Sequence, residues 1–291
     1  MKARRAVSCG IDIFCLLLFV YLLVFPERAS APTRAALEFC FTALLPALFM
    51  YSVLSRVAVG MQLTVRLSKL FGIDFVVLAI GMLCGAPIGA VTAVSLYEKG
   101  CIEKRYAEYL LSFTNNASLS FLLGYVVNTL FQNAEIGLRL AIYQLTATFI
   151  TAAVMKRIIF GRSKPKAFAG FAVKRVGLRD AVSEAAGSMI NICACAVFFA
   201  VAGSALTTSG IFSDTQGVLI KCLLEFSSGC AAAAKAGKGA FVLTAVSLGF
   251  TGLSVALQVY SVIANKLSAK PFLVGKLISG ALMTLLAVIC G

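Results

Sequence analysis

Long apolar runs restrict the fold of this chain more than any other feature. Stretches without strand-like alternation lie at 10–25, 35–55, 71–94, 106–131, 136–155, 181–206, 217–233, 240–264 and 271–290. A helix needs about 20 apolar residues to cross a hydrocarbon core of about 30 Å. Of the 291 residues, 60% are hydrophobic and 13% are charged. The sequence therefore predicts an all-α polytopic membrane protein without a separate soluble domain.

The residues that most membrane enzymes need are missing. The chain has no His, which excludes His-based proton transfer, His metal sites and the HExxH zinc motif. Asp74 has no second intramembrane Asp to complete an aspartyl protease pair, and 235–239 lacks the spacing of a Walker motif. We therefore expect no enzymatic activity, no catalytic residue, no metal site and no cofactor. Transport would draw its energy from a gradient or a partner.

Basic residues indicate the orientation of the chain. The net charge is +14, and in membrane proteins such an excess lies in cytoplasmic loops and on anionic headgroups. Loop 156–179 carries eight Lys and Arg residues and no acidic one, and Lys2, Arg4 and Arg5 precede the first apolar run. Both segments are predicted to be cytoplasmic. The lipid bilayer is an expected partner, and nucleic acid is not.

The first apolar run has two interpretations. A basic end precedes 10–25, and Ala29-Ser30-Ala31 resembles a signal-peptidase site. Pro32 follows directly and disfavours cleavage. We expect an uncleaved transmembrane helix, and a removed signal peptide is the alternative.

Counting the crossings predicts re-entrant segments. Two cytoplasmic segments need an even number of crossings between them, yet five apolar runs separate the N-terminus from 156–179. Gly85, Pro87 and Gly89 interrupt the middle of 71–94 and permit a turn. We predict a re-entrant hairpin there, and a Pro-kinked crossing helix is the alternative. The short and polar run 217–233 is predicted to be a second re-entrant hairpin.

The same order of elements occurs in both halves of the chain. Residues 35–155 and 181–291 each contain a long helix, a hairpin, a broken helix and a closing helix, and the two halves start on opposite sides of the membrane. This predicts an inverted repeat with two re-entrant helical hairpins and two broken helices. An N-terminal helix and loop at 1–34 precede it, and a basic linker at 156–180 joins its halves. Such repeats are typical of secondary transporters, in which interrupted helices bind solute near the midplane.

Two adjacent amides mark the interruption at 114–118. Asn115 and Asn116 lie in an apolar stretch, where an amide is costly to bury without hydrogen bonds. Adjacent side chains point to different sides, so we expect one amide to bind solute and the other to brace the hairpin. Ser118 is a further candidate solute-binding residue. Hydrogen bonding between helices is the alternative for the amides.

The corresponding interruption in the second half contains Glu225, Ser227 and Ser228. An intramembrane carboxylate is a functional candidate by default, so Glu225 is predicted to bind solute, coordinate Na⁺ or carry a coupling proton. The alternative is an ion pair with Lys221, which lies four residues earlier on the same helix.

A polar stripe follows the fourth interruption. Thr251, Ser254 and Gln258 lie at i, i+3 and i+7 and share one helix face. The stripe is predicted to face a solute cavity, and ordinary packing of polar residues between helices is the alternative.

Four motifs together resemble a known family. They read GAPIGA at 85–90, LSFTNNA at 111–117, LEFSSG at 224–229 and LGFTGLSVALQV at 248–259. This set resembles the nucleoside-recognition (Gate) family, in particular its sporulation integral membrane branch. The resemblance implies a fold similar to concentrative nucleoside transporters and, for this branch, uptake of dipicolinate by the forespore.

These observations lead to one expected function. We expect a protein of the bacterial inner membrane or a forespore membrane that moves a small polar or anionic solute, with H⁺ or Na⁺ as the coupling ion. A homo-oligomer is a further expectation. The alternatives are a transporter of nucleosides or other organic solutes, and a non-transporting membrane scaffold in spore-envelope assembly.

Overall fold

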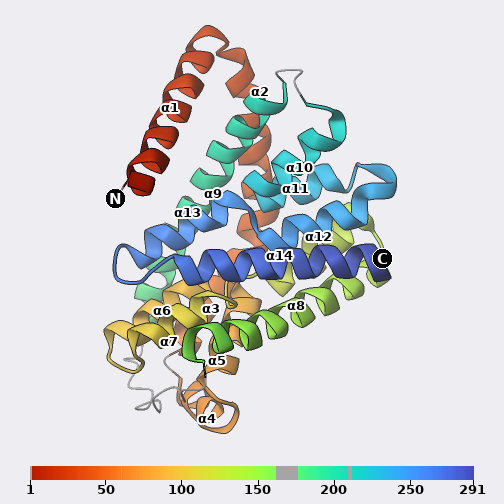
Figure 1. Cartoon of the computed structure of the whole chain (residues 1–291). Helices are drawn as coiled ribbons and strands as arrows, with labels where there is room; N and C mark the ends of the chain where they lie inside the picture. The colour runs from red at the N-terminus through yellow and green to blue at the C-terminus, as the bar shows by residue number, and fades with distance from the viewer. Residues whose placement is uncertain (1, 60, 162–175, 209–211) are drawn as a thin grey trace.

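Apolar helices build the fold in the computed structural model, which describes residues 2–59, 61–161, 176–208 and 212–291. Within these residues all regular structure is helical (Figure 1). The prediction of an all-α protein is therefore confirmed for this part of the chain.

The first half starts with a sharp bend and continues through shorter helices. The segments Asp12–Val24 and Glu27–Leu44 meet at 107°, and Figure 1 shows the first helix along the edge of the bundle. The elements are α1 (Lys2–Val24), α2 (Glu27–Phe39), the π-helix η1 (Cys40–Leu44), α3 (Leu45–Val59), α4 (Gln62–Phe71), α5 (Ile73–Cys84), α6 (Ile88–Glu98), α7 (Lys104–Leu111), the π-helix η2 (Phe121–Phe131) and α8 (Ala134–Phe160).

The second half contains two long helices with shorter ones between them. Local sequence sets several ends: Ser213 and Gln216 form a capping box at the start of one helix, and a Pro stands at the start of the last. The elements are α9 (Leu178–Thr207), α10 (Asp214–Leu224), α11 (Phe226–Ala233), the 3₁₀ turn η3 (Gly237–Gly239), α12 (Ala240–Phe250), α13 (Gly252–Ile263) and α14 (Lys270–Cys290).

Four helical segments of the described chain are long and apolar enough to cross a membrane. They are Ala134–Phe160, Leu178–Thr207, Gly237–Ile263 and Lys270–Cys290, and the bent N-terminal pair is a fifth candidate. These segments fit an integral membrane protein. They are fewer than the predicted apolar runs because several runs are divided into helices of 8–13 residues.

Helix ends lie at the four predicted interruptions. A break separates α5 from α6 at 85–87, and a longer one at 112–118 follows α7. Glu225 divides α10 from α11, and Thr251 divides α12 from α13.

The N-terminal region and the central loop contain more helix than the sequence predicted. Residues 27–34 belong to α2 rather than to a loop. Helices α8 and α9 extend into both ends of the basic segment 156–179, and 162–175 lie outside the described residues.

Two buried clusters lie beside the interruptions. The first contains Leu96, Leu110 and Val259, and the second contains Leu122 and Met283. Phe226 packs against both clusters. The interruption between α10 and α11 therefore adjoins both parts of the core.

Candidate functional site

The break between α5 and α6 packs tightly against the segment 112–120. A Cβ atom added to Gly81 would lie 2.1 Å from the Thr114 carbonyl oxygen, and one added to Gly89 would lie 2.4 Å from the same oxygen. Gly85 has φ 77° and lies against Ser118. These close approaches and the left-handed φ explain the glycines. We call this contact between 81–90 and 112–120 the first joint.

Two other predicted residues lie where helices begin at the first joint. Pro87 precedes α6 and follows Ala86 in a cis peptide bond. The backbone N–H of Ala86 donates to the carbonyl oxygen of Asn116 at 3.0 Å. Ser118 Oγ accepts from the N–H of Phe121 at 3.0 Å and thereby caps η2. In this structure both residues shape the backbone of the joint.

Asn115 joins the segment 112–120 to α6. Its side chain is fully buried, and its Oδ1 accepts from the N–H of Ala90 at 2.8 Å. Its Nδ2 donates to the carbonyl oxygen of Leu111 at 3.1 Å. Asn115 therefore satisfies one of the free N–H groups in the first turn of α6, which is the bracing role predicted for one of the two amides.

Asn116 joins the same segment to α8 and α14. Its Nδ2 donates to the carbonyl oxygen of Phe113 at 2.8 Å and to Thr148 Oγ1 at 3.1 Å. Its Oδ1 accepts from Lys276 Nζ at 3.1 Å. Asn116 therefore takes part in contacts between helices in this structure, which is the role that the alternative interpretation gave to the amides.

Glu225 caps the N-terminus of α11. Its carboxylate accepts from the N–H of Ser227 at 3.1 Å, from Ser227 Oγ at 2.6 Å and from the N–H of Ser228 at 2.7 Å. A negative charge at this helix end is also favoured by the helix dipole. Among the described residues no ion pair joins Glu225 to Lys221, so the alternative of a structural Lys–Glu pair is not what this structure contains.

The break at Glu225 packs against the elements that follow it. A Cβ atom added to Gly229 would lie 2.5 Å from Cys222 Cα, and Ser247 Oγ donates to the carbonyl oxygen of Phe226 at 2.8 Å. One added to Gly252 would lie 3.0 Å from the Leu224 carbonyl oxygen. The interruptions at Glu225 and Thr251 therefore meet in a second joint. The two joints are linked by Phe121 and Phe226, whose rings are 5.0 Å apart.

The polar stripe on α13 is buried. Thr251 has φ 57° and donates its hydroxyl to the carbonyl oxygen of Phe250. Ser254 Oγ and Gln258 Oε1 are buried without a hydrogen-bond partner among the described residues. The two residues are one helical turn apart, so both polar atoms lie on the same face of α13. A solute, an ion or water can supply the hydrogen bond or contact that each atom lacks.

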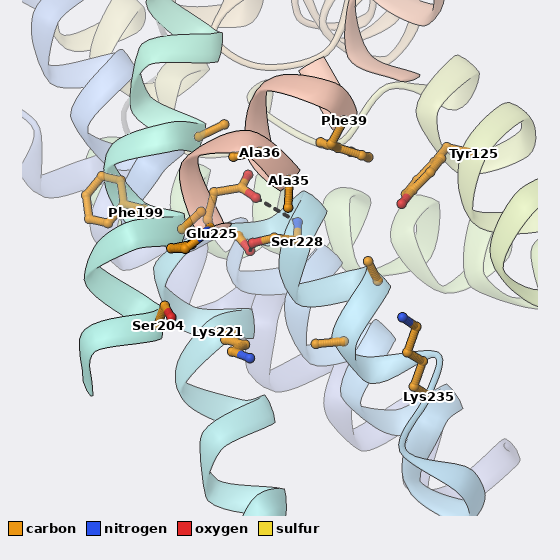
Figure 2. Close-up of a pocket in the computed structure, with 15 residues that line it drawn as sticks. Ala35, Ala36, Phe39, Tyr125, Phe199, Ser204, Lys221, Glu225, Ser228 and Lys235 are labelled. Atoms are coloured by element: carbon orange, nitrogen blue, oxygen red, sulfur yellow. Dashed lines mark hydrogen bonds between the residues drawn. The ribbon is translucent and has the colours of Figure 1, made fainter. Parts of the chain in front are cut away.

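A pocket of about 610 Å³ lies beside the second joint, between α2, α9, α10 and α11. Its polar lining includes Glu225, Ser228, Ser204 and two lysines, Lys221 and Lys235. Figure 2 shows Glu225 and Ser228 joined by a hydrogen bond near the centre of the view. The volume falls in the range of about 300–1,000 Å³ that is usual for small-molecule sites.

Aromatic and small side chains complete the pocket. Phe39, Tyr125 and Phe199 come from α2, η2 and α9, and Figure 2 shows Phe199 and Tyr125 on opposite sides of Glu225. Alanines from α2, α9 and α11 form much of the remaining wall. Such a lining offers apolar faces to a ring together with a few polar groups that fix its orientation.

The charges of the lining favour an anion. Lys221 and Lys235 outnumber Glu225, and the Glu225 carboxylate is already bound by the α11 backbone and Ser227. The ammonium groups remain available, because neither lysine forms an ion pair among the described residues. An acidic solute would therefore find two cations beside apolar walls.

The structure does not gather all predicted site residues around this pocket. Glu225 and Ser228 line it, and Ser227 lies directly behind them in the second joint. The other predicted residues lie elsewhere: Gly85, Pro87, Gly89, Asn115, Asn116 and Ser118 in the first joint, and Thr251, Ser254 and Gln258 along α13.

Several lining residues escaped the sequence analysis. Phe39 and Phe199 read as ordinary lipid-facing positions, because nothing in the sequence shows that α2 packs on α9. Lys221 was considered only as a partner of Glu225. Lys276 lies outside the pocket lining and was also missed. It is an isolated charge within an apolar run, and an intramembrane charge is a signal that could have identified it as a candidate functional residue.

Comparison with known proteins gives one distant relative with a descriptive name. The chain is similar to the sporulation integral membrane protein YlbJ of Bacillus subtilis (strain 168), with 23% identity over 322 aligned positions that cover 92% of this chain and 78% of YlbJ. No family model matches the chain. No solved structure matches it either. The similarity and the apolar helices agree on an integral membrane protein.

Proposed function

We propose that the protein is a membrane transporter of a small organic anion and that the pocket beside Glu225 binds the solute. The observation that carries this proposal is a pocket of about 610 Å³ with two lysines and three aromatic rings, beside a helix interruption in a membrane protein. Interrupted helices are where secondary transporters bind solute. Lys221 and Lys235, which form no ion pair among the described residues, give the pocket its preference for a negatively charged solute.

The element order supports a repeated architecture. In the first half, the helical segment from Glu27 to Val59 is followed by α4, which has no counterpart in the second half, and then by α5 and α6, by α7 and η2, and by α8. In the second half, α9 is followed by α10 and α11, by α12 and α13, and by α14. Each half thus has a long helix, two interrupted pairs and a closing helix. We propose that the halves are related as an inverted repeat, with the domain limits expected from the sequence.

The first interrupted pair of each half is proposed to be re-entrant. Helices α5 and α6 contain 12 and 11 residues, and α10 and α11 contain 11 and 8. Each helix is shorter than the roughly 20 residues needed to cross a bilayer. A pair that turns back places its interruption inside the membrane. Because such a pair does not cross the membrane, the N-terminus and 156–179 both remain in the cytoplasm.

Dipicolinate is the first solute to test. It is a planar ring with two carboxylates, and Lys221 and Lys235 can bind carboxylates while Phe39, Tyr125 or Phe199 packs on the ring. The name of YlbJ refers to sporulation, and we extend that role to this chain as part of the proposal. Nucleosides are the second class, because the same rings can stack on a base.

Uptake into proteoliposomes tests the proposal. Wild-type protein should accumulate labelled dipicolinate, whereas Lys221→Met, which keeps the aliphatic chain that packs near Gly203, should lose most of the uptake. Lys238→Met is the matched control, because Lys238 is exposed and lies outside the pocket lining. The anion proposal fails if wild-type protein does not move dipicolinate, or if all three proteins transport it equally. Uptake of nucleosides without dipicolinate would favour the second class of solute.

A further inference from the structure

Lys276 is a buried cation inside a candidate membrane span. It lies on α14 within Lys270–Cys290, six residues from the start of the span, and it is 5% exposed. Six residues correspond to about 9 Å along a helix. A lysine near a helix end usually extends its ammonium group to the membrane surface, whereas Lys276 stays inside. Intramembrane lysines of this kind mark ion or solute pathways by default.

A neutral amide holds the Lys276 ammonium. Nζ donates to Asn116 Oδ1 at 3.1 Å, and no carboxylate of the described residues lies within 4.0 Å of it. An Asn carbonyl oxygen can accept a hydrogen bond from an –NH₂ group as well as from an –NH₃⁺ group, and the bond from the charged donor is the stronger one. Loss of the proton would therefore keep this contact and would leave no unpaired carboxylate behind.

The helices packed against α14 bring no counter-charge to Lys276. Helix α12 and the segment 112–120 contain no ionisable residue. On α7 and α8 the ionisable groups with known partners bond elsewhere: Tyr106 to Asp74, Glu108 to Ser268, Arg105 to Ile159, Glu135 to Arg139, Tyr143 to Cys290 and Lys156 to Asp74. The remaining ones there, Lys104, Tyr109 and Arg157, form no ion pair with Lys276.

The surroundings of Lys276 contain a buried hydrogen-bond acceptor without a partner among the described residues. Gln144 Nε2 donates to the Ala117 carbonyl oxygen at 2.9 Å, and it shares Met82 Sδ with Asn116 Nδ2 at 3.6 Å. Gln144 is 1% exposed, yet its Oε1 has no partner in the described chain. This acceptor can hold a donor such as water beside the Asn116–Lys276 pair.

Glu225 is less suited to carry a proton. Its two carboxylate oxygens already accept from two backbone N–H groups and from Ser227 Oγ. A proton on either oxygen would compete with these donors and weaken the cap of α11. Lys276, which bonds to Asn116 of the first joint, is in contrast a basic group whose proton can leave without breaking a helix cap.

We propose that Lys276 is the proton-binding site that couples a proton gradient to solute movement. The Nζ lone pair takes a proton from hydronium, so that –NH₂ and H₃O⁺ become –NH₃⁺ and H₂O, and the reverse step releases it. Asn116 connects the site to the first joint, because the carbonyl oxygen of the same residue accepts from Ala86 N beside α6. Proton binding therefore acts on the contact between the first hairpin and 112–120. The coupling role rests on the proposed transport function, whereas proton binding does not.

Thermal unfolding in detergent without solute tests proton binding by itself. Wild type, Lys276→Met and Lys270→Met are compared at about pH 6 and about pH 9. Lys270 is the matched control, because it is an exposed lysine on the same helix. The midpoint difference between wild type and Lys276→Met should change by about 3 °C or more between the two pH values, and Lys270→Met should follow wild type. A difference that is independent of pH overturns the proposal.

A second variant covers failure of Lys276→Met to fold. Lys276→Arg keeps the positive charge at both pH values, because Arg does not lose its proton in proteins. It should show the same pH-dependent midpoint difference from wild type. Equal pH responses of wild type and Lys276→Arg overturn the proposal in that case.

Uptake driven by an imposed pH gradient tests the coupling. Lys276→Met should lose the gradient-dependent part of uptake, whereas Lys270→Met should retain it. Uptake that keeps its response to the gradient in Lys276→Met, or wild-type uptake that follows a Na⁺ gradient alone, overturns the coupling but leaves the transporter proposal standing. A wild type that moves no solute refutes the transport function and the coupling, and the unfolding experiment then still decides whether Lys276 binds a proton.

Discussion

Replacing Gly89 by Ala should destabilise the first joint. The new Cβ would lie 2.4 Å from the Thr114 carbonyl oxygen, 2.6 Å from Thr114 Oγ1 and 2.7 Å from the carbonyl carbon, whereas ordinary contact begins at 3.4 Å. Two of these atoms belong to backbone that Asn115 also holds. The neighbours therefore cannot move away by a simple rotamer change, and the segment 112–120 has to shift from α6.

The expected cost follows from overpacking in well-packed interiors. Extra carbon atoms there cost about 1–3 kcal/mol. A change of 1 kcal/mol shifts the midpoint of a domain of this size class by about 2–4 °C, so Gly89→Ala should unfold about 2–12 °C below wild type. Circular dichroism during heating in detergent measures the midpoint, at one fixed scan rate because membrane proteins often unfold irreversibly.

Gly187→Ala provides the control. Gly187 lies in the interior of α9, and an added Cβ meets no atom within 4 Å. Alanine in a helix interior is more stable than glycine by about 0.5–1 kcal/mol, so this variant should unfold at or slightly above the wild-type temperature. If Gly89→Ala has the same unfolding midpoint as wild type and Gly187→Ala, the tight contact between 81–90 and 112–120 is refuted.

Three further substitutions test other contacts. Asn115→Leu leaves the Ala90 N–H buried without its acceptor and should cost about 1–3 kcal/mol, visible as a lower unfolding midpoint; an unchanged midpoint would show that another group caps α6. Arg56→Met removes three hydrogen bonds from α3 to α9 and should also lower the midpoint, whereas no change would mean that these bonds contribute nothing net. Replacing Lys164 and Lys166 by Ser should leave uptake unchanged, because other segments build the pocket; abolished function would favour a scaffold that binds partners through 156–179.

Helix interruptions were predictable because their causes are local. Gly85 and Pro87 disfavour a continuous helix wherever they occur, and Glu225, Ser227 and Ser228 place polar groups within an otherwise apolar run. The structure ends helices at both places. Similarly, the lack of strand-like alternation was enough to predict an all-α chain.

The pocket was not predictable, because it depends on packing between distant segments. Phe39 and Phe199 lie on α2 and α9 and look in the sequence like any lipid-facing residue. The hydrogen bond between Asn116 and Lys276 was not predictable for the same reason, because the two residues are 160 positions apart in the sequence. The sequence marked Asn115 and Asn116 as unusual, but only their partners show that they join helices in this structure.

The structure also changes the choice of test residue. Glu225→Gln would remove an oxygen that accepts from the α11 backbone, so a loss of function would not separate binding from a damaged helix cap. Lysines of the pocket avoid this problem, because their ammonium groups form no ion pair with the described chain.

Equilibrium binding of labelled dipicolinate to purified protein tests the solute pocket most directly. A hydrogen bond to a charged group is worth about 1.5–3 kcal/mol, so Lys221→Met and Lys235→Met should each weaken binding about tenfold or more. Lys238→Met should bind like wild type. If wild-type protein binds the anion and both pocket variants bind it equally well, the solute site lies elsewhere and the account of this pocket is wrong.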